Sequence, residues 1–589
     1  MPLPSFGHSS TFFPAPSRGR ALITFLVSIL ACAALFAPGH ARAAGAQLRV
    51  DPEVAATQPR ISARQAIVIA NRTPGVQKEL QGHRDLHPDS VTLFKPSGHW
   101  RIKYISGRTQ LADVTVDGHT GKVVEAWTGI QAGWVMARGD KGYFGDKFDS
   151  WYIWLPMCLL FVAPFFDPRR PFRMLHLDLL VLVGGFGVSH WFFNKGEIGT
   201  SVPLVYPVFA YLLARMLYAG LRPRRPREPL VPLAPIALLV AGIVLLGGFR
   251  IGLDVATGKV GDVGYGSAIG ATRVLDGKAL YKDSGVLDQH LDTYGPVNYL
   301  AYVPFVKAFP PSQQEIETPD DYKLSAARAA TIAFDLLTIA GLFVLGMRLR
   351  KGRAGPALGV ALAYAWVAFP YTMFPLMSNT NDTLVSALLV WALVALSSPP
   401  ARGALLGLAA AAKFAPLALA PLFASGRGEG SEHGLAGRIR PWTMFSATFG
   451  LVVLVSIMAF VPDEGGLRVF YDQTIGFQFS RESPFSIWGQ NPGLDPILSL
   501  TKLGVVALGI WVAFEPRTRD AFQVAALGAA VLMALQFIAI HWFYLYIVWF
   551  APYVLVALFG EYRTGPVQRD RQELERIELP DRELEPVGA

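Results

Sequence analysis

Twelve long apolar runs, separated by polar segments, constrain the fold of this 589-residue chain more than any other feature. They lie at roughly 151–166, 174–194, 201–219, 230–249, 324–347, 355–377, 383–397, 403–424, 441–461, 496–514, 520–540 and 542–560. Most of these runs reach the roughly 20 residues that a helix needs to cross the hydrocarbon core of a bilayer. Only 16% of the residues are charged, which excludes a single water-soluble enzyme. The sequence therefore predicts a polytopic α-helical membrane protein with about 11–13 transmembrane or re-entrant segments.

The positive charges between the runs predict which side of the membrane each loop faces. One set of loops carries 17 Lys and Arg in 51 residues, namely 167–173, 220–229, 348–354, 398–402, 425–440 and 515–520. The opposing loops carry 10 in 119 residues, namely 195–200, 250–323, 378–382 and 462–495. The positive-inside rule places the first set in the cytoplasm, at a cell (plasma) membrane crossed many times. The net charge of +9 therefore reflects topology and predicts no nucleic-acid partner.

The N-terminus predicts export of the segment after it. Arg18 and Arg20 precede an apolar stretch, Ala21–Pro38, and a run of small residues. This pattern is typical of a signal peptide, here within 1–43, and an uncleaved anchor helix is the alternative. Both place the next segment outside the cytoplasm.

The segment 46–127 is polar and predicts a small exported α+β domain. A helical run at Ser62–Asn71 precedes alternating, strand-like stretches at Gly98–Ile105 and Val114–Glu125, with Asp-Gly and Thr-Gly turns. The order of this helix and these strands resembles a PepSY domain. The remaining domains that we expect are a transmembrane domain at 151–560, with a long outer loop at 250–323, and a charged cytoplasmic tail at 561–589.

The apolar run 403–424 breaks the alternation of sides. Arg402 precedes it and the arginines of 425–440 follow it, so both ends favour the cytoplasm. Lys413 and a nearby proline interrupt the run, which predicts a re-entrant hairpin with Lys413 near its tip. A single crossing with a tolerated lysine is the alternative. If Lys413 lies at mid-membrane depth, a buried ion pair with Asp335 is one expectation and binding of a substrate phosphate is another.

The outer loop 250–323 contains the strongest candidate for catalysis. Asp262 follows the end of a predicted membrane helix and precedes aromatic, amphipathic stretches that we expect to lie along the membrane surface. A carboxylate at that position is placed where a lipid headgroup and a water-borne acceptor meet, which suits a general base. An ordinary solvated loop carboxylate is the alternative.

Several motifs occur in one order along the chain and resemble glycosyltransferase family eighty-seven over about 230–560. The chain departs from the family at Tyr-Gly-Pro, where Tyr-Pro-Pro is usual, and at Asn-Thr-Asn-Asp, where a Gly-Gln-x-Asn type is common. The motifs are Asp262-x-x-Tyr265, Leu275-x-Gly277-x-x-Leu-Tyr281, Tyr294-Gly-Pro296, Ala326-Ala-Arg328, Asn379-x-Asn381-Asp382, the stretch from Gly407 to Lys413-x-x-Pro416, and His541-Trp542.

The resemblance implies a GT-C-type membrane enzyme that transfers a sugar with inversion at the outer face. The donor would be a polyprenyl-phosphate sugar, expected to carry mannose, and the acceptor an envelope glycan or glycolipid. Asp262 matches the family's general base. The resemblance also gives candidate substrate-binding residues, which are Lys413, Arg328, His541, Tyr265, Tyr294, Asp382 and Arg481.

Structural roles compete for some of these residues. Arg328 sits at a span end, where it can snorkel to the interface. Asp382 starts a predicted helix, where an N-terminal cap is the alternative, and Arg481 is also compatible with ordinary loop polarity. Because the resemblance begins near residue 230, we expect the exported domain to be dispensable for transfer.

The sequence predicts no cofactor and no metal site. No Walker or Rossmann glycine pattern is present, and the spacing of the histidines in the exported domain fits no recognised ligand set. The rival function is a secondary transporter or lipid flippase, because a broken helix and intramembrane charges also occur there. In a third interpretation, the exported domain is a regulatory or peptide-binding module and the rest of the chain is an inert membrane anchor. Twelve apolar runs are too many for an anchor.

Overall fold

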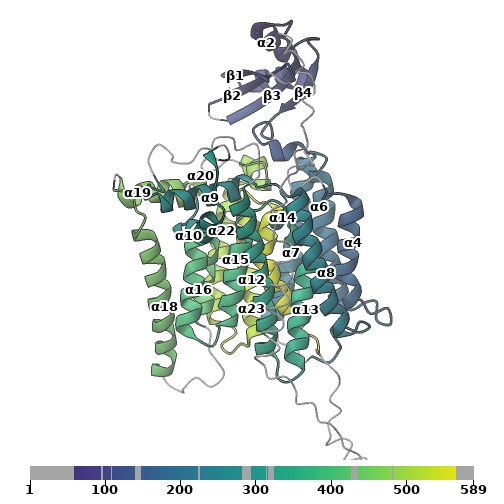
Figure 1. The fold of residues 1–589 in the computed structure, drawn as a ribbon, viewed down its shortest axis with the longest axis vertical. Coiled ribbons are helices and arrows are strands. Elements are labelled where there is room, and N and C mark those ends of the chain that lie inside the picture. Colours follow the sequence, from purple (N-terminus) through teal and green to yellow (C-terminus); the bar gives the residue numbers. More distant parts are fainter. Residues whose placement is uncertain are drawn as a thin grey trace, which may run out of the picture.

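The computed structural model describes residues 59–564 with short gaps (Figure 1). The gaps are 95–96, 108, 140–146, 223–225, 282–292, 314, 316–323, 426–434, 464 and 481–482. The predicted signal segment, nearly all of the predicted tail, and Arg481 lie outside the described residues. In the described part, a small sheet domain stands at one end of a larger helical body.

The N-terminal domain is α+β, as predicted. Its elements are the helices α2 (Ala63–Asn71) and α3 (Pro74–Gly82) and the strands β1 (His87–Phe94), β2 (His99–Ser106), β3 (Thr109–Asp117) and β4 (Val123–Thr128). The strands form one antiparallel sheet in the order β1-β2-β3-β4. Helix α2 begins at a capping box, in which Ser62 and Gln65 each bond the other's backbone N–H.

Strand alternation gives this sheet two different faces. The residues of one face pack with α2 and α3 into a hydrophobic core that includes Ala66, Ala70, Val76, Ile102, Tyr104, Ala112, Val114 and Val116. The opposite face carries Arg101, Asp113 and Thr115, which alternate with core residues along β2 and β3. The second face is therefore polar.

The helical body confirms a polytopic helical membrane protein. Among the described residues, seven helices are long and apolar enough to cross a membrane, or up to eight if one bent pair counts as a single span. The candidate spans are Met174–Phe193, Ile198–Leu221, Ile236–Thr257, Ser325–Leu349, Ile439–Met458, Pro492–Phe514 and Ala521–Ile538, with Ala354–Ala368 and Pro370–Met377 as the bent pair. Shorter apolar helices at Trp151–Phe165, Asp382–Val394, Ala415–Ala424 and Tyr544–Gly560 correspond to other predicted runs.

The helices bear the labels of Figure 1. They are α4 (Trp151–Val162), α5 (Met174–Leu180), α6 (Phe186–Phe193), α7 (Ile198–Leu221), α8 (Ile236–Thr257), α9 (Asp262–Leu275), α10 (Pro296–Ala308), α12 (Ser325–Leu349), α13 (Ala354–Ala368), α14 (Met373–Met377), α15 (Asp382–Val394), α16 (Pro399–Ala412), α17 (Ala420–Ala424), α18 (Leu435–Met458), α19 (Gly466–Tyr471), α20 (Phe477–Ser480), α21 (Ile487–Gln490), α22 (Asp495–Phe514), α23 (Ala521–Ile538) and α24 (Ile547–Gly560).

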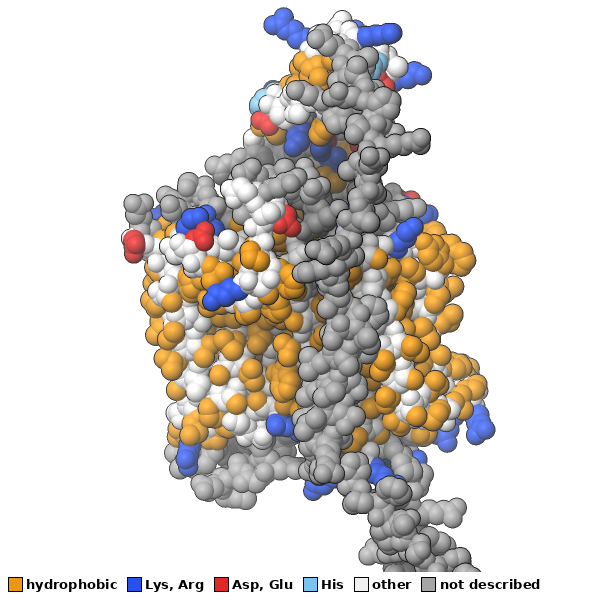
Figure 2. Space-filling view, in the orientation of Figure 1, with side chains coloured by type: hydrophobic (Ala, Val, Ile, Leu, Met, Phe, Trp, Pro, Cys, Tyr) orange, Lys and Arg blue, Asp and Glu red, His pale blue; other side chains and the backbone are white. Residues whose placement is uncertain are grey.

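The outer surface of the body is apolar along its sides. Figure 2 shows hydrophobic side chains spread over the flanks of the helices, with charged side chains mainly toward the two ends. On α22, Leu500 is 70% exposed and Leu503 is 68% exposed. An apolar surface of this extent is far larger than soluble monomers show, and a bilayer is the environment that covers it.

The segment 403–424 folds back on itself, as the predicted re-entrant hairpin requires. Helix α16 ends at Lys413, and a 3-10 turn (Ala415–Leu419) leads into α17. The Arg402 Nη2 donates a hydrogen bond of 3.4 Å to the Ala424 carbonyl, so the two ends of the segment meet. A single crossing would separate these residues by the thickness of the membrane.

A candidate active site at one end of the helical bundle

Two glycines let backbone segments meet where the site forms. The Gly295 N–H donates to the Ala412 carbonyl at 3.1 Å, and a Cβ added at Gly295 would lie 2.0 Å from the Ala411 carbonyl oxygen. A Cβ at Gly264 would lie 1.9 Å from the Asn379 carbonyl oxygen. Only glycine permits approaches this close. The start of α10 therefore packs directly on the end of α16, and α9 on the segment before α15.

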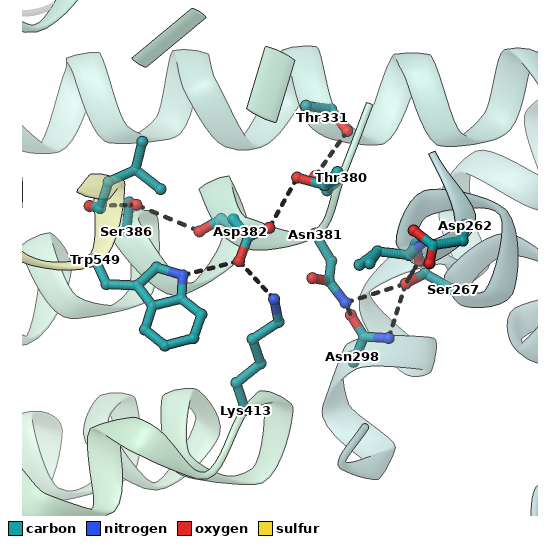
Figure 3. Close-up of polar contacts among 12 residues, drawn as sticks. Asp262, Ser267, Asn298, Thr331, Thr380, Asn381, Asp382, Ser386, Lys413 and Trp549 are labelled. Atoms are coloured by element: carbon teal, nitrogen blue, oxygen red, sulfur yellow. Dashed lines mark hydrogen bonds and ion pairs between the residues drawn. The ribbon is translucent and has the colours of Figure 1, made fainter. Parts of the chain in front are cut away.

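A buried ion pair joins α15 to the tip of the hairpin. The Lys413 Nζ lies 2.5 Å from Asp382 Oδ1, and the Trp549 indole N–H donates to the same oxygen at 2.9 Å (Figure 3). The Thr380 hydroxyl donates to Asp382 Oδ2 at 2.9 Å. Both charged residues are buried. The carboxylate is thus fully engaged, as burial of a charge requires.

Aromatic rings surround the Lys413 ammonium group. It lies 5.1 Å from the ring centre of Trp549, 5.2 Å from that of Tyr294 and 5.7 Å from that of Tyr546. Each ring lies within the distance at which a cation is attracted to an aromatic face. Tyr546 also stacks on Trp549, with centroids 4.4 Å apart. We call these three rings the aromatic cage.

A network of amides ties α9, α10 and α15 together beside the ion pair. The Asn381 Nδ2 donates to Asn298 Oδ1 at 2.7 Å and to the Ser267 hydroxyl at 3.2 Å. The Asn298 Nδ2 donates to the same hydroxyl at 2.9 Å. All three side chains are buried. Because Ser267 lies on α9, the network fixes the helix that begins at Asp262 (Figure 3).

A second buried carboxylate, Asp254 on α8, is bonded to the segment that precedes α15. The Asn379 Nδ2 donates to Asp254 Oδ1 at 2.9 Å, and the Arg328 Nε lies 3.8 Å from the same oxygen. Arg328 also donates to the Gly258 carbonyl at 2.9 Å. Asn379 has a φ of 48°, a left-handed conformation that asparagine adopts more readily than most residues. Asn379, Asn381 and Asp382 of the motif therefore each bind a different part of the fold.

Asp262 is the exposed acid of the group. It is the first residue of α9, and its Oδ1 accepts the Val263 N–H at 2.8 Å. The amide network of Ser267, Asn298 and Asn381 connects the helix that begins at Asp262 to the segment whose Asp382 binds Lys413 (Figure 3). The ends of α9, α10, α15 and α16 that meet here thus combine a solvent-exposed carboxylate with a buried, caged cation. Such a combination can accept a proton and stabilise developing negative charge.

His541 lies next to Tyr546 of the aromatic cage. Its Nδ1 is 2.9 Å from the Ser483 hydroxyl, and its ring centre is 6.3 Å from that of Tyr546. The rings of Trp134 and Phe485 each lie 5.4 Å from the His541 ring. His541 is therefore connected to the Lys413 cage through Tyr546.

The structure brings some of the predicted residues together and separates others. Lys413 contacts both Asp382 and Tyr294, and the helix that starts at Asp262 is connected to them through the amide network. Arg328 instead belongs to the Asp254 group. Tyr265 is half-buried and packs against a cluster formed by α9, α10 and α12.

Two structural expectations are wrong. Asp335 does not pair with Lys413, because the Arg250 Nη2 donates to Asp335 at 3.0 Å and Trp366 donates to it at 2.8 Å. Depth along separate helices does not determine which helices are neighbours. Asp382 is not an N-cap either, since Asn381 occupies that position and the Asp382 side chain binds Lys413.

Sequence reasoning missed several residues of the site. Trp549, Tyr546, Asn298 and Ser267 lie in helices or turns whose sequences are otherwise apolar or ordinary. Their partners come from distant parts of the chain, so local pattern gives no signal for them. The density of aromatic residues after His541 is the one sequence feature that could have indicated the cage.

Part of the chain that contains this site matches a known protein family. Residues 293–541 match glycosyltransferase family 87. The matched region includes Tyr294, Arg328, Asp382 and Lys413 and ends at His541, whereas Asp262 precedes it. The match is shorter than the range of about 230–560 over which the sequence motifs resemble the family. Together with the apolar helices, it supports the assignment of this protein as a membrane glycosyltransferase. Neither a curated protein nor a solved structure matches the chain.

Proposed function

We propose that this protein transfers a sugar, mannose, from a polyprenyl phosphate to an envelope glycan or glycolipid on the extracytoplasmic side. The observation that carries the proposal is that the helix starting at the exposed Asp262 is bonded, through Ser267, Asn298 and Asn381, to the segment whose Asp382 holds the buried Lys413, at one end of a bundle of apolar helices. A lipid-linked donor suits that position, because its chain would lie among lipids and its phosphate at the helix ends. The match over residues 293–541 supports the reaction class.

In the proposed reaction Asp262 acts as general base. Its carboxylate takes the proton of an acceptor hydroxyl while the hydroxyl oxygen bonds to the anomeric carbon of the donor sugar. The bond from that carbon to the phosphate oxygen breaks, and the phosphate keeps the electron pair. Attack from the side opposite the leaving phosphate inverts the anomeric centre.

Lys413 is suited to the charge on the departing phosphate. An ammonium group has three N–H donors, and the Asp382 bond takes one of them. The aromatic cage and Asp382 hold the group in position before the reaction, so little reorganisation accompanies the development of charge. Asp382 and Trp549 would act through Lys413 as positioning residues.

Membranes that contain the protein, incubated with a panel of radiolabelled polyprenyl-phosphate sugars, test the proposal. We expect the label of polyprenyl-phosphate mannose to enter an envelope glycan or glycolipid, and membranes lacking the protein serve as control. Transfer from a different lipid-linked sugar would overturn the choice of mannose. Transfer only from a nucleotide sugar, or from no donor, would overturn the proposed function.

A further inference from the structure

The polar face of the N-terminal sheet contains a preorganised pair of guanidinium groups. Arg101 donates from Nε to Asp113 Oδ1 at 2.9 Å and from Nη2 to Oδ2 at 2.6 Å, and the Arg138 Nη2 donates to Oδ2 at 2.6 Å. The Asp113 side chain is almost fully buried. One carboxylate thus holds two arginines in fixed positions, and the three groups together keep a single positive charge.

A pocket of about 410 Å³ lies above this pair. Arg101, Thr115 and Glu125 line it and form one row across the sheet, because they are paired neighbours on β2, β3 and β4. Phe94 adds an aromatic ring, and Arg138 closes the pocket from the segment after the sheet. The Arg138 side chain is 8% exposed, and its buried Nε has no hydrogen-bond partner in the described part of the chain.

The segment that closes this pocket also reaches the candidate active site. A 3-10 turn, Val135–Arg138, lines the pocket, and Trp134 immediately before it packs on His541 and Phe485. Gly139, after the turn, has a φ of 78° and approaches the backbone at Gly196. One short turn therefore lines the pocket and packs, through Trp134, on His541 of the helical body.

From this arrangement we propose that the pocket binds the part of an oligosaccharide acceptor that lies remote from the reacting hydroxyl. This inference rests on the proposed function, and it identifies the acceptor of that reaction as an extended glycan. The row of Arg101, Thr115 and Glu125 offers both hydrogen-bond donors and acceptors for sugar hydroxyls. The pocket volume of about 410 Å³ is large enough for a few sugar rings. The exported domain would then assist transfer, contrary to the expectation that it is dispensable.

The test uses the full-length protein in lipid nanodiscs and envelope oligosaccharides released from cells that lack it, separated into short and long fractions. Arg101→Gln removes a donor from the pocket, and Thr115→Tyr fills the pocket without removing a charge. We expect each to weaken binding of the long fraction, and to raise its KM in transfer, by about tenfold, with little change for the short fraction. Lys103→Gln is the matched control, because it removes a positive charge from the same strand and face outside the pocket.

The two proposals fail in different ways. Equal KM and affinity for the long fraction in wild type, Arg101→Gln and Thr115→Tyr would overturn the subsite while transfer itself continued. Binding that depends on the pocket, without transfer from any donor, would overturn the proposed function and leave the glycan site standing. Arg101→Gln could weaken binding by destabilising the domain, which a lower melting temperature would reveal. In that case the affinity of Thr115→Tyr for the long fraction decides whether the pocket binds glycan, because tyrosine is favoured in strands and should leave the sheet folded.

Discussion

At the scale of single residues, the pairing of Lys413 is the assignment that most affects how the site is understood. Its partner is Asp382 at 2.5 Å, whereas Asp335 is held by Arg250. Removing one member of a buried ion pair leaves the other charge uncompensated, which typically costs about 3–5 kcal/mol. We therefore expect Lys413→Ala to lower the melting temperature strongly, and Asp382→Asn/Lys413→Ala to recover part of the loss.

A second double mutant provides the control for this prediction. Asp335→Asn removes the partner of Arg250, so Asp335→Asn/Lys413→Ala should be at least as unstable as Lys413→Ala alone. Thermal melts of the purified proteins in nanodiscs measure both effects. Rescue by the Asp335 change, with none by the Asp382 change, would contradict the pairing seen in the structure.

The second prediction at this scale concerns the pH dependence of the sheet domain. Burial raises the pKa of Asp113, but the hydrogen bonds and charges of Arg101 and Arg138 outweigh it and hold the pKa below the ordinary 3.8. A carboxyl whose pKa is lower in the folded state stabilises the fold above its unfolded pKa, and this contribution is lost as the pH falls through the folded pKa. We expect hydrogen-exchange protection of β2 and β3, corrected for intrinsic rates, to fall below about pH 4.

Asp113→Asn identifies the group responsible. The variant should be less protected at neutral pH and should show a weaker pH dependence between neutral pH and about pH 3. The pKa values of Asp85 and Asp117 are also lowered by their hydrogen bonds, and these two groups account for the remaining dependence. If its protection fell with pH as steeply as that of the wild type, another group would control the transition.

At the scale of elements, the close approach of α10 to the end of α16 places Tyr294 beside Lys413. A Cβ at Gly295 would lie 2.0 Å from a backbone oxygen, so the two helices must shift apart. We expect Gly295→Ala to destabilise the protein by about 1–3 kcal/mol and to slow transfer. Gly247→Ala on α8 is the control, because a Cβ there meets nothing within 4 Å, and its melting temperature should not fall.

Elements and their partners differ in how well the sequence predicts them. The hairpin at 403–424 was predictable, because charges at both ends and a lysine and proline in the middle are local signals. The sheet was predicted in outline, although β1 was not identified. The Lys413–Asp382 pair and the aromatic cage were not predictable, because they join residues from α10, α15, α16 and α24 whose contact depends on packing alone.

At the scale of the whole molecule, α9 and α19 lie toward the end of the helical body that bears the sheet domain (Figure 1). The charge distribution predicts that 46–150, 250–323 and 462–495 face outward and that 425–440 faces the cytoplasm. In a protein without native cysteines, an impermeant thiol reagent added to intact cells should label Ser284→Cys and not Ser431→Cys. Equal labelling of the two would contradict this topology.

The central claim, that the outer end of this bundle is a transferase site with Asp262 as its base, is tested most directly by single-turnover transfer at saturating donor. Asp262→Asn keeps the size of the side chain and removes the proton acceptor, so the rate should fall by at least about 100-fold. Asp276→Asn is the matched control, since Asp276 is an exposed acid at the other end of α9. We expect a near-normal rate for this control, and an Asp262→Asn rate within about threefold of wild type would contradict the assignment of the base.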